Sequence, residues 1–415
     1  MRTARKLFLL TLTVVCLTTL NLSEAKKPDN PGGGGDGGGG QNDSARFSVT
    51  ELPVEGLPVV VTDPDANDIV TVAVDSDEAG YVSAAYVLLD RSSGIVLESG
   101  FLPEPLFVDP NDGVMKNGGS GPIGANSVGE IVGYAQTFDP DLVDDVSPPR
   151  AIYWSDDGDG YDFEVLPILP GFFRSSACGI NSSGDIVGFI GPWRDRGKAV
   201  LWEAGTHNIV DLNTPAIAAQ GWELFVANDI NDAGLIVGSG YLNGVSRGYL
   251  LDRDTETVWP TPLIGPADQS DAYRINEMGR VIGTAWDGES IHYGTDPDFV
   301  LGYSWDPFSP DAVTLPSVTE NTGHAFYLND FNAVTGNSFI PIDDYSSTID
   351  SVPTLWEIDA NGNVNTTELQ NVIEKKSYTL QYCGDINNDG WIGVKARTFI
   401  KRIHRRPAVL LIPNN

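Results

Sequence analysis

Clustered acidic side chains are the first residues in this sequence whose type and spacing suit a chemical role. Asp156, Asp157, Asp159 and Asp162 alternate with glycine and tyrosine in a short loop. Oxygen ligands at nearly alternate positions, with a glycine for the turn, are typical of Ca²⁺ loops. A solvated hairpin turn has the same composition and is the simpler interpretation. These four carboxylates are therefore weak Ca²⁺ candidates, and the sequence indicates no other cofactor.

Other residues with chemical potential show no catalytic spacing. An acidic loop at residues 384–390 also resembles a Ca²⁺ loop, but Ala396 occupies the position where a carboxylate ligand should lie. The four histidines lack metal spacing and are expected to be single surface or loop residues; they are His207, His292, His324 and His404. The sequence contains no nucleophile elbow, phosphate loop or dinucleotide fingerprint. We therefore expect no enzyme, with a propeller enzyme acting on extracellular polysaccharide as an alternative.

A recurring sequence pattern extends over most of the chain. The pattern Ala-x-x-Ile-Asn-x-x-Gly-x-Ile-Val-Gly recurs about every 50 residues, and copies at Asn329 and Asn387 are degraded. Its asparagine can bond to the backbone two residues on, and its glycine tolerates a positive φ, so each copy predicts a β-hairpin turn. The clearest turn residues are Asn126, Gly129, Asn181, Gly184, Asn231, Gly234, Asn276 and Gly279.

A second recurring element follows each hairpin, as in Ala199-Val200-Leu201-Trp202, and a further short strand follows it. Each period therefore predicts four short antiparallel strands. We expect an all-β fold, a β-propeller of seven blades whose last blade is completed by the N-terminal strand 47–52. The missing first hairpin is placed near Asn67. Six blades or an open β-solenoid are the alternatives.

The N-terminus predicts export. Residues 1–25 have a basic start, an apolar stretch and a small-residue cleavage site, which is typical of a signal peptide. Residues 26–46 form a Gly-rich linker that we expect to be disordered. The repeat domain then covers residues 47–415. We therefore expect the protein to be secreted or located at the cell surface, in the bacterial extracellular space or periplasm. We expect no membrane span after processing.

Charge restricts the partners. The chain has 57 Asp and Glu against 25 Lys and Arg, for a net charge of −32. Nucleic acid and anionic membrane surfaces require a basic footprint, so neither is expected. The basic segment 395–406 is interpreted as the connection between the second and third strands of the last blade, paired with acidic neighbours, and a patch for nucleic acid or another polyanion is the alternative. The sequence does not determine whether Cys178 and Cys383 form a disulfide. Trp222, Trp286 and Trp391 fall outside the repeated tryptophan position and are expected at the surface.

The repeat resembles the HAF repeat family, which comprises probable extracellular proteins of bacteria. The hairpin pattern matches well at the four intact copies, and the strand ending in Trp202 resembles the family's His-Ala-Phe-Leu-Trp, with Lys198 in place of the histidine. The literal His324-Ala325-Phe326 lies on the hairpin strand instead. The resemblance covers residues 47–412 and implies an exported repeat protein without an assigned catalytic residue.

These observations favour an exported, non-catalytic binding module or cell-surface scaffold, with a Ca²⁺-dependent adhesion or structural surface protein as a further alternative. We expect a monomer whose partner is an extracellular protein or glycan. The long connections at 134–149, 284–299 and 337–351 vary most between repeats, and variable loops on a rigid scaffold are where binding is usually built. They are the expected binding face.

Overall fold

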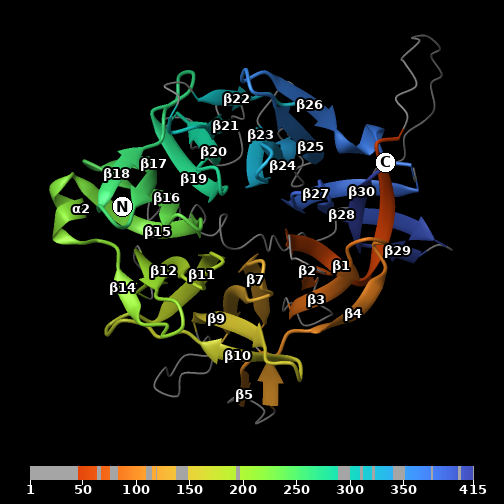
Figure 1. Ribbon diagram of the computed structural model, residues 1–415, viewed down its shortest axis with the longest axis horizontal. Coiled ribbons are helices and arrows are strands. Elements are labelled where there is room, and N and C mark those ends of the chain that lie inside the picture. The colour runs from red at the N-terminus through yellow and green to blue at the C-terminus, as the bar shows by residue number, and fades with distance from the viewer. Residues whose placement is uncertain are drawn as a thin grey trace, which may run out of the picture.

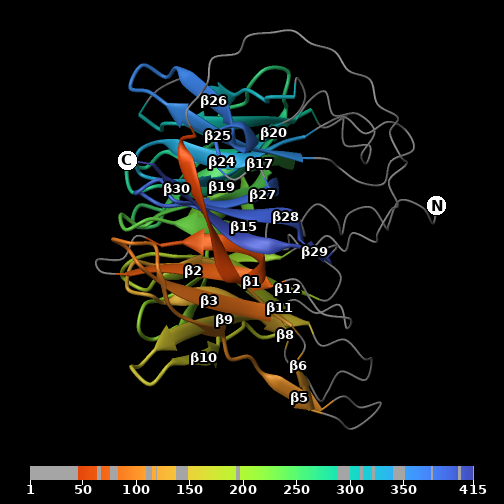
Figure 2. The ribbon, with the colours of Figure 1, turned by 90° about the vertical axis from the view of Figure 1, so that its right-hand side faces the viewer.

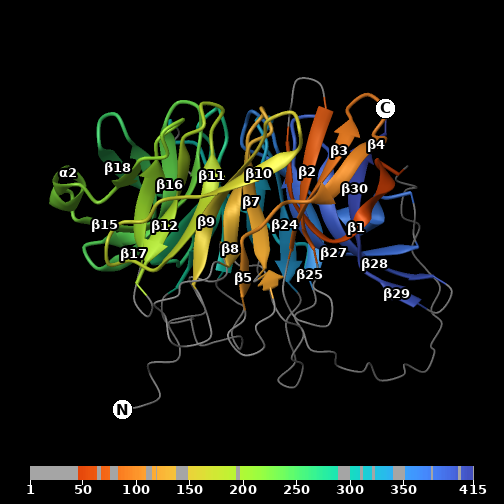
Figure 3. The ribbon, with the colours of Figure 1, turned by 90° about the horizontal axis from the view of Figure 1, so that it is seen from below.

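The protein folds as a ring of radial β-sheets around a central axis (Figure 1). The computed structural model describes residues 45–62, 67–74, 83–108, 115–117, 119–136, 148–192, 197–287, 300–308, 312–319, 323–339, 351–374, 377–400 and 403–414. Seen from the side, the strands run along the thickness of a disc (Figure 3). This arrangement confirms the predicted β-propeller of four-stranded antiparallel blades.

The described strands pair in seven sets of four, numbered here as blades 1 to 7, and β1 belongs to two of them. Blades 1 to 3 contain β1 (Phe47–Val61), β2 (Asn67–Val74), β3 (Ser83–Asp90) and β4 (Val96–Phe101); β7 (Ser120–Ala125), β8 (Ile131–Gln136), β9 (Pro149–Asp156) and β10 (Tyr161–Val165); and β11 (Arg174–Ile180), β12 (Ile186–Gly191), β13 (Lys198–Trp202) and β14 (Ile209–Asp211).

Blades 4 to 6 contain β15 (Trp222–Ile230), β16 (Leu235–Leu242), β17 (Val245–Asp252) and β18 (Thr257–Pro260); β19 (Gln269–Ile275), β20 (Val281–Trp286), β21 (Val300–Trp305) and β22 (Val313–Leu315); and β23 (Gly323–Leu328), β24 (Ala333–Phe339), β25 (Ser351–Ile358) and β26 (Val364–Glu368). Blade 7 contains β27 (Tyr378–Ile386), β28 (Ile392–Ile400), β30 (Pro407–Pro413) and the start of β1. The remaining elements are β5 (Leu106–Val108), β6 (Met115–Asn117), β29 (Ile403–Arg405), α2 (Pro215–Ala219) and η1 (Leu369–Asn371).

Strand β1 closes the ring. Its first part, from Phe47 to Glu51, pairs antiparallel with β30, and its second part, from Gly56 to Val61, pairs with β2. One continuous strand is therefore the outermost strand of blade 7 and the innermost strand of blade 1 (Figure 2). This pairing joins the two ends of the repeat array, as the sequence led us to expect. An open solenoid would not contain it.

Tryptophans at the end of the third strand lie between blades. Trp154, Trp202 and Trp356 are fully buried. Each indole Nε1–H donates to the carbonyl of a proline in the segment that follows the preceding blade, at 2.6, 2.8 and 2.7 Å; the acceptors are Pro103, Pro167 and Pro316. The recurring tryptophan thus fills the space between neighbouring sheets and satisfies a backbone carbonyl there.

Some expectations about individual residues were wrong. Trp222, Trp286 and Trp391 are 5%, 8% and 6% exposed. Trp222 packs in the apolar cluster of blades 3 and 4, and Trp391 in that of blades 1 and 7. In blade 1, the asparagine position of the hairpin is taken by Thr62, whose backbone N–H donates to the Ile69 carbonyl. The first hairpin itself lies near Asn67 as predicted, because Asn67 begins β2 and β2 pairs antiparallel with β1.

Cys178 and Cys383 form no disulfide and lie buried on the innermost strands of blades 3 and 7. The expectation that His324 is a surface or loop residue was also wrong. His324 lies on the innermost strand of blade 6, and burial lowers its pKa to about 4. His207 is also largely buried, with Nδ1 3.0 Å from a Glu164 carboxylate oxygen.

Candidate functional site

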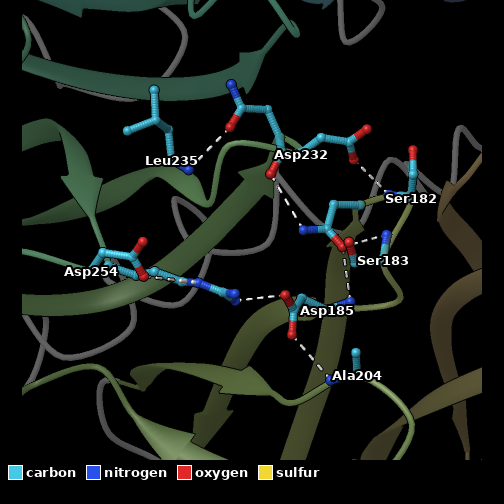
Figure 4. A network of polar contacts seen from close by, with 10 residues as sticks. Ser182, Ser183, Asp185, Ala204, Asp232, Leu235 and Asp254 are labelled. Atoms are coloured by element: carbon cyan, nitrogen blue, oxygen red, sulfur yellow. Dashed lines mark hydrogen bonds and ion pairs between the residues drawn. The ribbon is translucent and has the colours of Figure 1, made fainter.

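The repeat asparagines build the turns between the first and second strands of the blades. In the Asn231 turn, the side-chain Oδ1 accepts from the Leu235 backbone N–H at 3.0 Å (Figure 4). The Gly234 N–H donates to the Asn231 carbonyl at 3.0 Å. Gly234 has a φ of 77°, which favours glycine. The other three glycines named above, Gly129, Gly184 and Gly279, have φ values between 82° and 91°. A short-range pattern therefore determines each turn locally.

The same asparagines also link neighbouring blades in a row that runs from blade 2 through blade 7 to blade 1, which we call the asparagine circle. Each side-chain Nδ2 donates to the backbone carbonyl at the equivalent position of the next blade. The pairs are Asn126–Asn181, Asn181–Asn231, Asn231–Asn276, Asn276–Asn329, Asn329–Asn387 and Asn387–Thr62, at 3.0 to 3.4 Å. All six asparagines are at most 6% exposed. Because buried amides with both ends bonded are held in one geometry, the circle fixes the turns relative to one another.

A second ladder lies one residue further along. The Ser182 N–H donates to Asp232 Oδ1 at 2.7 Å (Figure 4), the Asp232 N–H to Glu277 Oε2 at 3.0 Å, and the Glu277 N–H to Asp330 Oδ1 at 2.9 Å. Burial, followed by the nearby charges of Asp232 and Asp330, raises the pKa of Glu277 to about 7. Three carboxylates are thus held side by side across blades 4 to 6.

The next turn position presents apolar side chains to solvent. Met278 and Phe331 are 71% and 72% exposed, on turns of neighbouring blades. Together with the three ladder carboxylates they form a surface that we call the turn-face patch: Asp232, Glu277, Met278, Asp330 and Phe331. On the other side of the ring, Val128 occupies the same turn position and is 69% exposed. Exposed side chains at one repeat position, on turns fixed by hydrogen bonds, make an ordered surface.

A second group of polar residues lies on the innermost strands, two residues before the turn asparagines. Asp229 accepts from the Ile275 N–H of blade 5 at 3.0 Å, and Asp385 accepts from the Val61 N–H of blade 1 at 3.1 Å. The Arg274 guanidinium lies over the Tyr327 ring, 5.2 Å from its centroid. We call Asp229, Arg274, Tyr327 and Asp385 the inner belt, because they connect the inner strands of blades 4 to 7.

Burial and opposite charges set the electrostatics of this belt. Burial raises the pKa of Asp229, and it raises the pKa of nearby Asp271, also on an innermost strand, to about 6. The charges of Asp229 and Asp385 raise the pKa of Arg274, against the effect of burial. One guanidinium, two carboxylates and a phenol therefore lie close enough to interact at the centre of the ring. Such groups can bind a polar ligand or move a proton.

The belt is the feature that sequence reasoning missed. In every first strand the register shifts near this position, as between Ala227 and Asp229 and between Ala272 and Arg274. A β-bulge re-aims the side chains next to it. The residue two before each turn asparagine is the available signal, and it changes from Gly179 to Asp229 to Arg274 without a repeat pattern.

The predicted Ca²⁺ loop forms the hairpin between β9 and β10. Asp156 Oδ1 accepts from the backbone N–H groups of Gly158 and Gly160 at 2.8 and 3.1 Å, and Asp157 Oδ1 accepts from the Asp159 N–H at 3.1 Å. Asp162 bonds to the Phe163 N–H at 2.8 Å. The side chains of Asp156 and Asp157 thus accept hydrogen bonds that stabilise the turn itself. Over the described ranges, no group of three or more His, Cys, Asp or Glu is placed to hold a metal ion.

Other predicted sites are placed only in part. Of the three long connections, residues 137–147, 288–299 and 340–350 lie outside the described residues, as do residues 1–44 with the signal peptide and most of the linker, and His292. The basic segment lies on β28 and β29, where Arg405 pairs with Glu51 at 2.6 Å and Glu55 at 3.0 Å. Within the part of the chain that the structure describes, no helix is long and apolar enough to cross a membrane.

Comparison with family models gives no match, and no curated protein matches the sequence. Solved structures similar to this chain include an ulvan lyase of polysaccharide lyase family PL25, at 11% identity over 88% of this chain and 95% of that chain, with a TM-score of 0.47. The Dos1 propeller is similar at 11% identity over 89% and 95%, with a TM-score of 0.43. TolB from Acinetobacter baumannii is similar at 11% identity over 84% and 80%, with a TM-score of 0.36. No residue or activity is carried over from them.

Proposed function

We propose that this chain is an exported, non-catalytic binding propeller whose partner covers the turn-face patch. The observation that carries the proposal is the exposure of Met278 and Phe331 on turns that the asparagine circle holds in place. Methionine and aromatic side chains are enriched at protein interfaces, where a few such residues supply most of the binding energy.

The surrounding geometry favours tight binding. A surface that is already ordered in the free protein loses little conformational entropy on association. The ladder carboxylates of Asp232, Glu277 and Asp330 border the apolar pair and favour a partner with basic groups at the edge of its own apolar surface. An extracellular protein with such a surface is the partner class that this patch fits.

Arrays of glycans and of extracellular proteins test the proposal with two matched variants. The variant M278S/F331S removes the apolar pair, and I95S/F101S removes two apolar side chains of blade 1 that are 63% and 65% exposed. We expect a protein ligand for the wild type, loss of its signal in M278S/F331S, and retention in I95S/F101S. Equal signals for all three proteins, or no ligand at all, would contradict the proposal.

A second candidate function is an enzyme acting on extracellular polysaccharide. The inner belt favours it, because a carboxyl group with a raised pKa, as in Asp229, is suited to general acid catalysis. Reducing-end release from acidic and neutral glycans would detect this activity. It should disappear in D229N and D385N while M278S/F331S retains it, and the binding proposal expects no release from any of these proteins.

Export and family membership are parts of the same proposal. The signal peptide at 1–25 should be removed on secretion, and the HAF repeat resemblance supports an extracellular location. Mass spectrometry of protein recovered from the culture medium or envelope is expected to find a mature chain beginning at Lys26. Recovery of the intact chain from the cytoplasm would contradict export.

A further inference from the structure

A groove lies between blades 3 and 4, apart from the turn-face patch and the inner belt. Its volume is ≈ 660 Å³. Val210 of blade 3, which is 36% exposed, gives it an apolar surface. Its buried floor is formed by Leu201, Leu212, Ile217 and Leu251, which are at most 7% exposed. Such a groove can receive an aliphatic chain several carbons long.

The helix α2 holds one side of the groove in place. Thr214 caps the helix by accepting from the Ile217 N–H, and Ile217 is 1% exposed against the blade 4 core. At the other end, Gln220 donates through Nε2 to the Glu256 carbonyl at 2.7 Å and accepts through Oε1 from the Val258 N–H at 3.1 Å. The turn that carries Glu256 is therefore tied to the helix, so the groove is already formed in the free protein.

The charges along the groove are mostly negative. Five carboxylates and one guanidinium line it; they are Asp185, Glu203, Asp211, Asp254, Glu256 and Arg253. The Arg253 guanidinium forms an ion pair with the Asp185 carboxylate at 2.6 Å, and Asp185 also accepts from the Ala204 N–H at 3.0 Å (Figure 4). Asp211 is paired with Lys198 at 2.6 Å.

Two of these carboxylates are left to meet a ligand. Among the described residues, neither Glu203 nor Glu256 forms an ion pair. Both line the groove together with the exposed side chain of Val210. The complementary group is a cation carried on an apolar stem, because its methylenes would contact Val210 while its head reached the carboxylates.

We propose that this groove binds the lysine or arginine side chain of an extended peptide segment of a partner protein. The stem lies along Val210 above the buried floor of the groove, and the cationic head binds the carboxylates of Glu203 and Glu256. The site is separate from the turn-face patch, so it stands whether or not that patch binds a partner.

Methyl NMR on the full chain, deuterated and labelled at Ile, Leu and Val methyl groups, tests the site directly. The probe is the acetylated and amidated peptide Gly-Lys-Gly-Lys-Gly. Its Nε-acetylated form and free 1,5-diaminopentane are the comparison ligands. We expect saturable shifts at the methyl groups of Val210, Ile217 and Leu251, and none at Ile95 or Val128.

Two double variants separate the groove from the general negative charge of the protein. E203Q/E256Q removes the two available carboxylates, and D157N/D159N removes two charges from the exposed hairpin between β9 and β10. We expect E203Q/E256Q to weaken peptide binding about tenfold, and D157N/D159N to change it less than about twofold. Melting curves of both variants confirm that they fold.

Several results would overturn the proposal. They are the absence of saturable shifts at millimolar peptide, equal binding of the acetylated peptide, and equal weakening in the two variants. Diaminopentane binding as tightly as the lysine peptide would assign the groove to free diamines and would equally refute a peptide site.

Discussion

At the residue scale, a single turn asparagine connects local sequence to the closed ring. Asn231 is 1% exposed, and its amide group serves its own turn through Oδ1 and the next blade through Nδ2. An alanine at this position would leave the Leu235 N–H and the Asn276 carbonyl without their side-chain partner. Buried polar groups left in this state are costly.

N231A is therefore expected to lower the free energy of unfolding by about 1–3 kcal/mol. Asn365, whose Nδ2 bonds to Glu357 at 3.0 Å in an exposed position, provides the control variant N365A. Urea denaturation of both variants and the wild type measures the difference. Equal midpoints for N231A and N365A would show that the asparagine circle contributes nothing to stability.

Asp271 gives a pH-dependent prediction. Burial raises the pKa of this carboxyl from 3.8 to about 6, so the folded state holds its proton more tightly than the unfolded state does. This group's contribution to stability is fully present below pH 4 and is lost as the pH rises from about 4 to about 6. D271N removes that loss. Its free energy of unfolding relative to wild type should thus increase by about 1–3 kcal/mol across this window.

Chemical denaturation at a series of pH values checks this result. His324 contributes equally to both proteins and cancels in the comparison. A constant difference between D271N and wild type from pH 4 to pH 7 would contradict the raised pKa.

At the element scale, β1 closes the ring by pairing with both β30 and β2. Phe47, Val49 and Leu52 are 3%, 4% and 2% exposed in the blade 7 and blade 1 cores, and Glu51 and Glu55 meet Arg405. Burying side chains of this size stabilises a fold by about 1.5–3 kcal/mol each. The side chains of β1 therefore contribute substantially to the stability of the closed ring.

A variant that begins at residue 53 should lose the closing strand and unfold at a markedly lower temperature than one that begins at residue 45. Adding a synthetic peptide of residues 45–55 in excess should restore part of that loss by occupying the exposed edge of β30. Differential scanning calorimetry measures both effects. Equal melting temperatures for the two truncated variants would contradict the closure.

The elements were predictable where residue types have distinct local roles. Asn126, Asn181 and their equivalents, with glycine three residues later, specify one turn geometry, so the repeat predicts hairpins and therefore a propeller. The circle between blades was not predictable, since a local pattern says nothing about the partner of an amide nitrogen. Trp222 was misplaced because departure from a repeat position does not determine whether a side chain is buried.

The inner belt was beyond prediction for a related reason. Its residues share a structural position but not one residue type, since aspartate, arginine and tyrosine all occur there, and the register shift that places them is visible only in the paired strands. The position two residues before each turn asparagine therefore carries side chains that differ from blade to blade.

At the scale of the whole molecule, negative charge dominates. A net charge of −32 repels itself across the compact ring more than across an expanded chain. The same charge keeps such proteins soluble and favours basic partners. The turn-face patch and the groove between blades 3 and 4 place part of this charge beside apolar side chains.

Screening should therefore stabilise the protein. Raising NaCl from about 10 mM to about 300 mM shortens the Debye length from about 30 Å to less than 8 Å, so the melting temperature is expected to increase. The exposed pairs such as Arg46–Glu357 weaken in salt but contribute little. A melting temperature that decreases over this range would show that attractive pairs outweigh the self-repulsion.

Hydrogen–deuterium exchange with the ligand from the protein array tests the central claim most directly, because it distinguishes the two faces of the ring. Binding to the turn-face patch should slow exchange in peptides covering 231–235, 276–280 and 329–333, and leave those covering 134–136 and 284–287 unchanged. Protection at the latter segments instead, where the long connections begin, would contradict the account and assign the binding face to the opposite side.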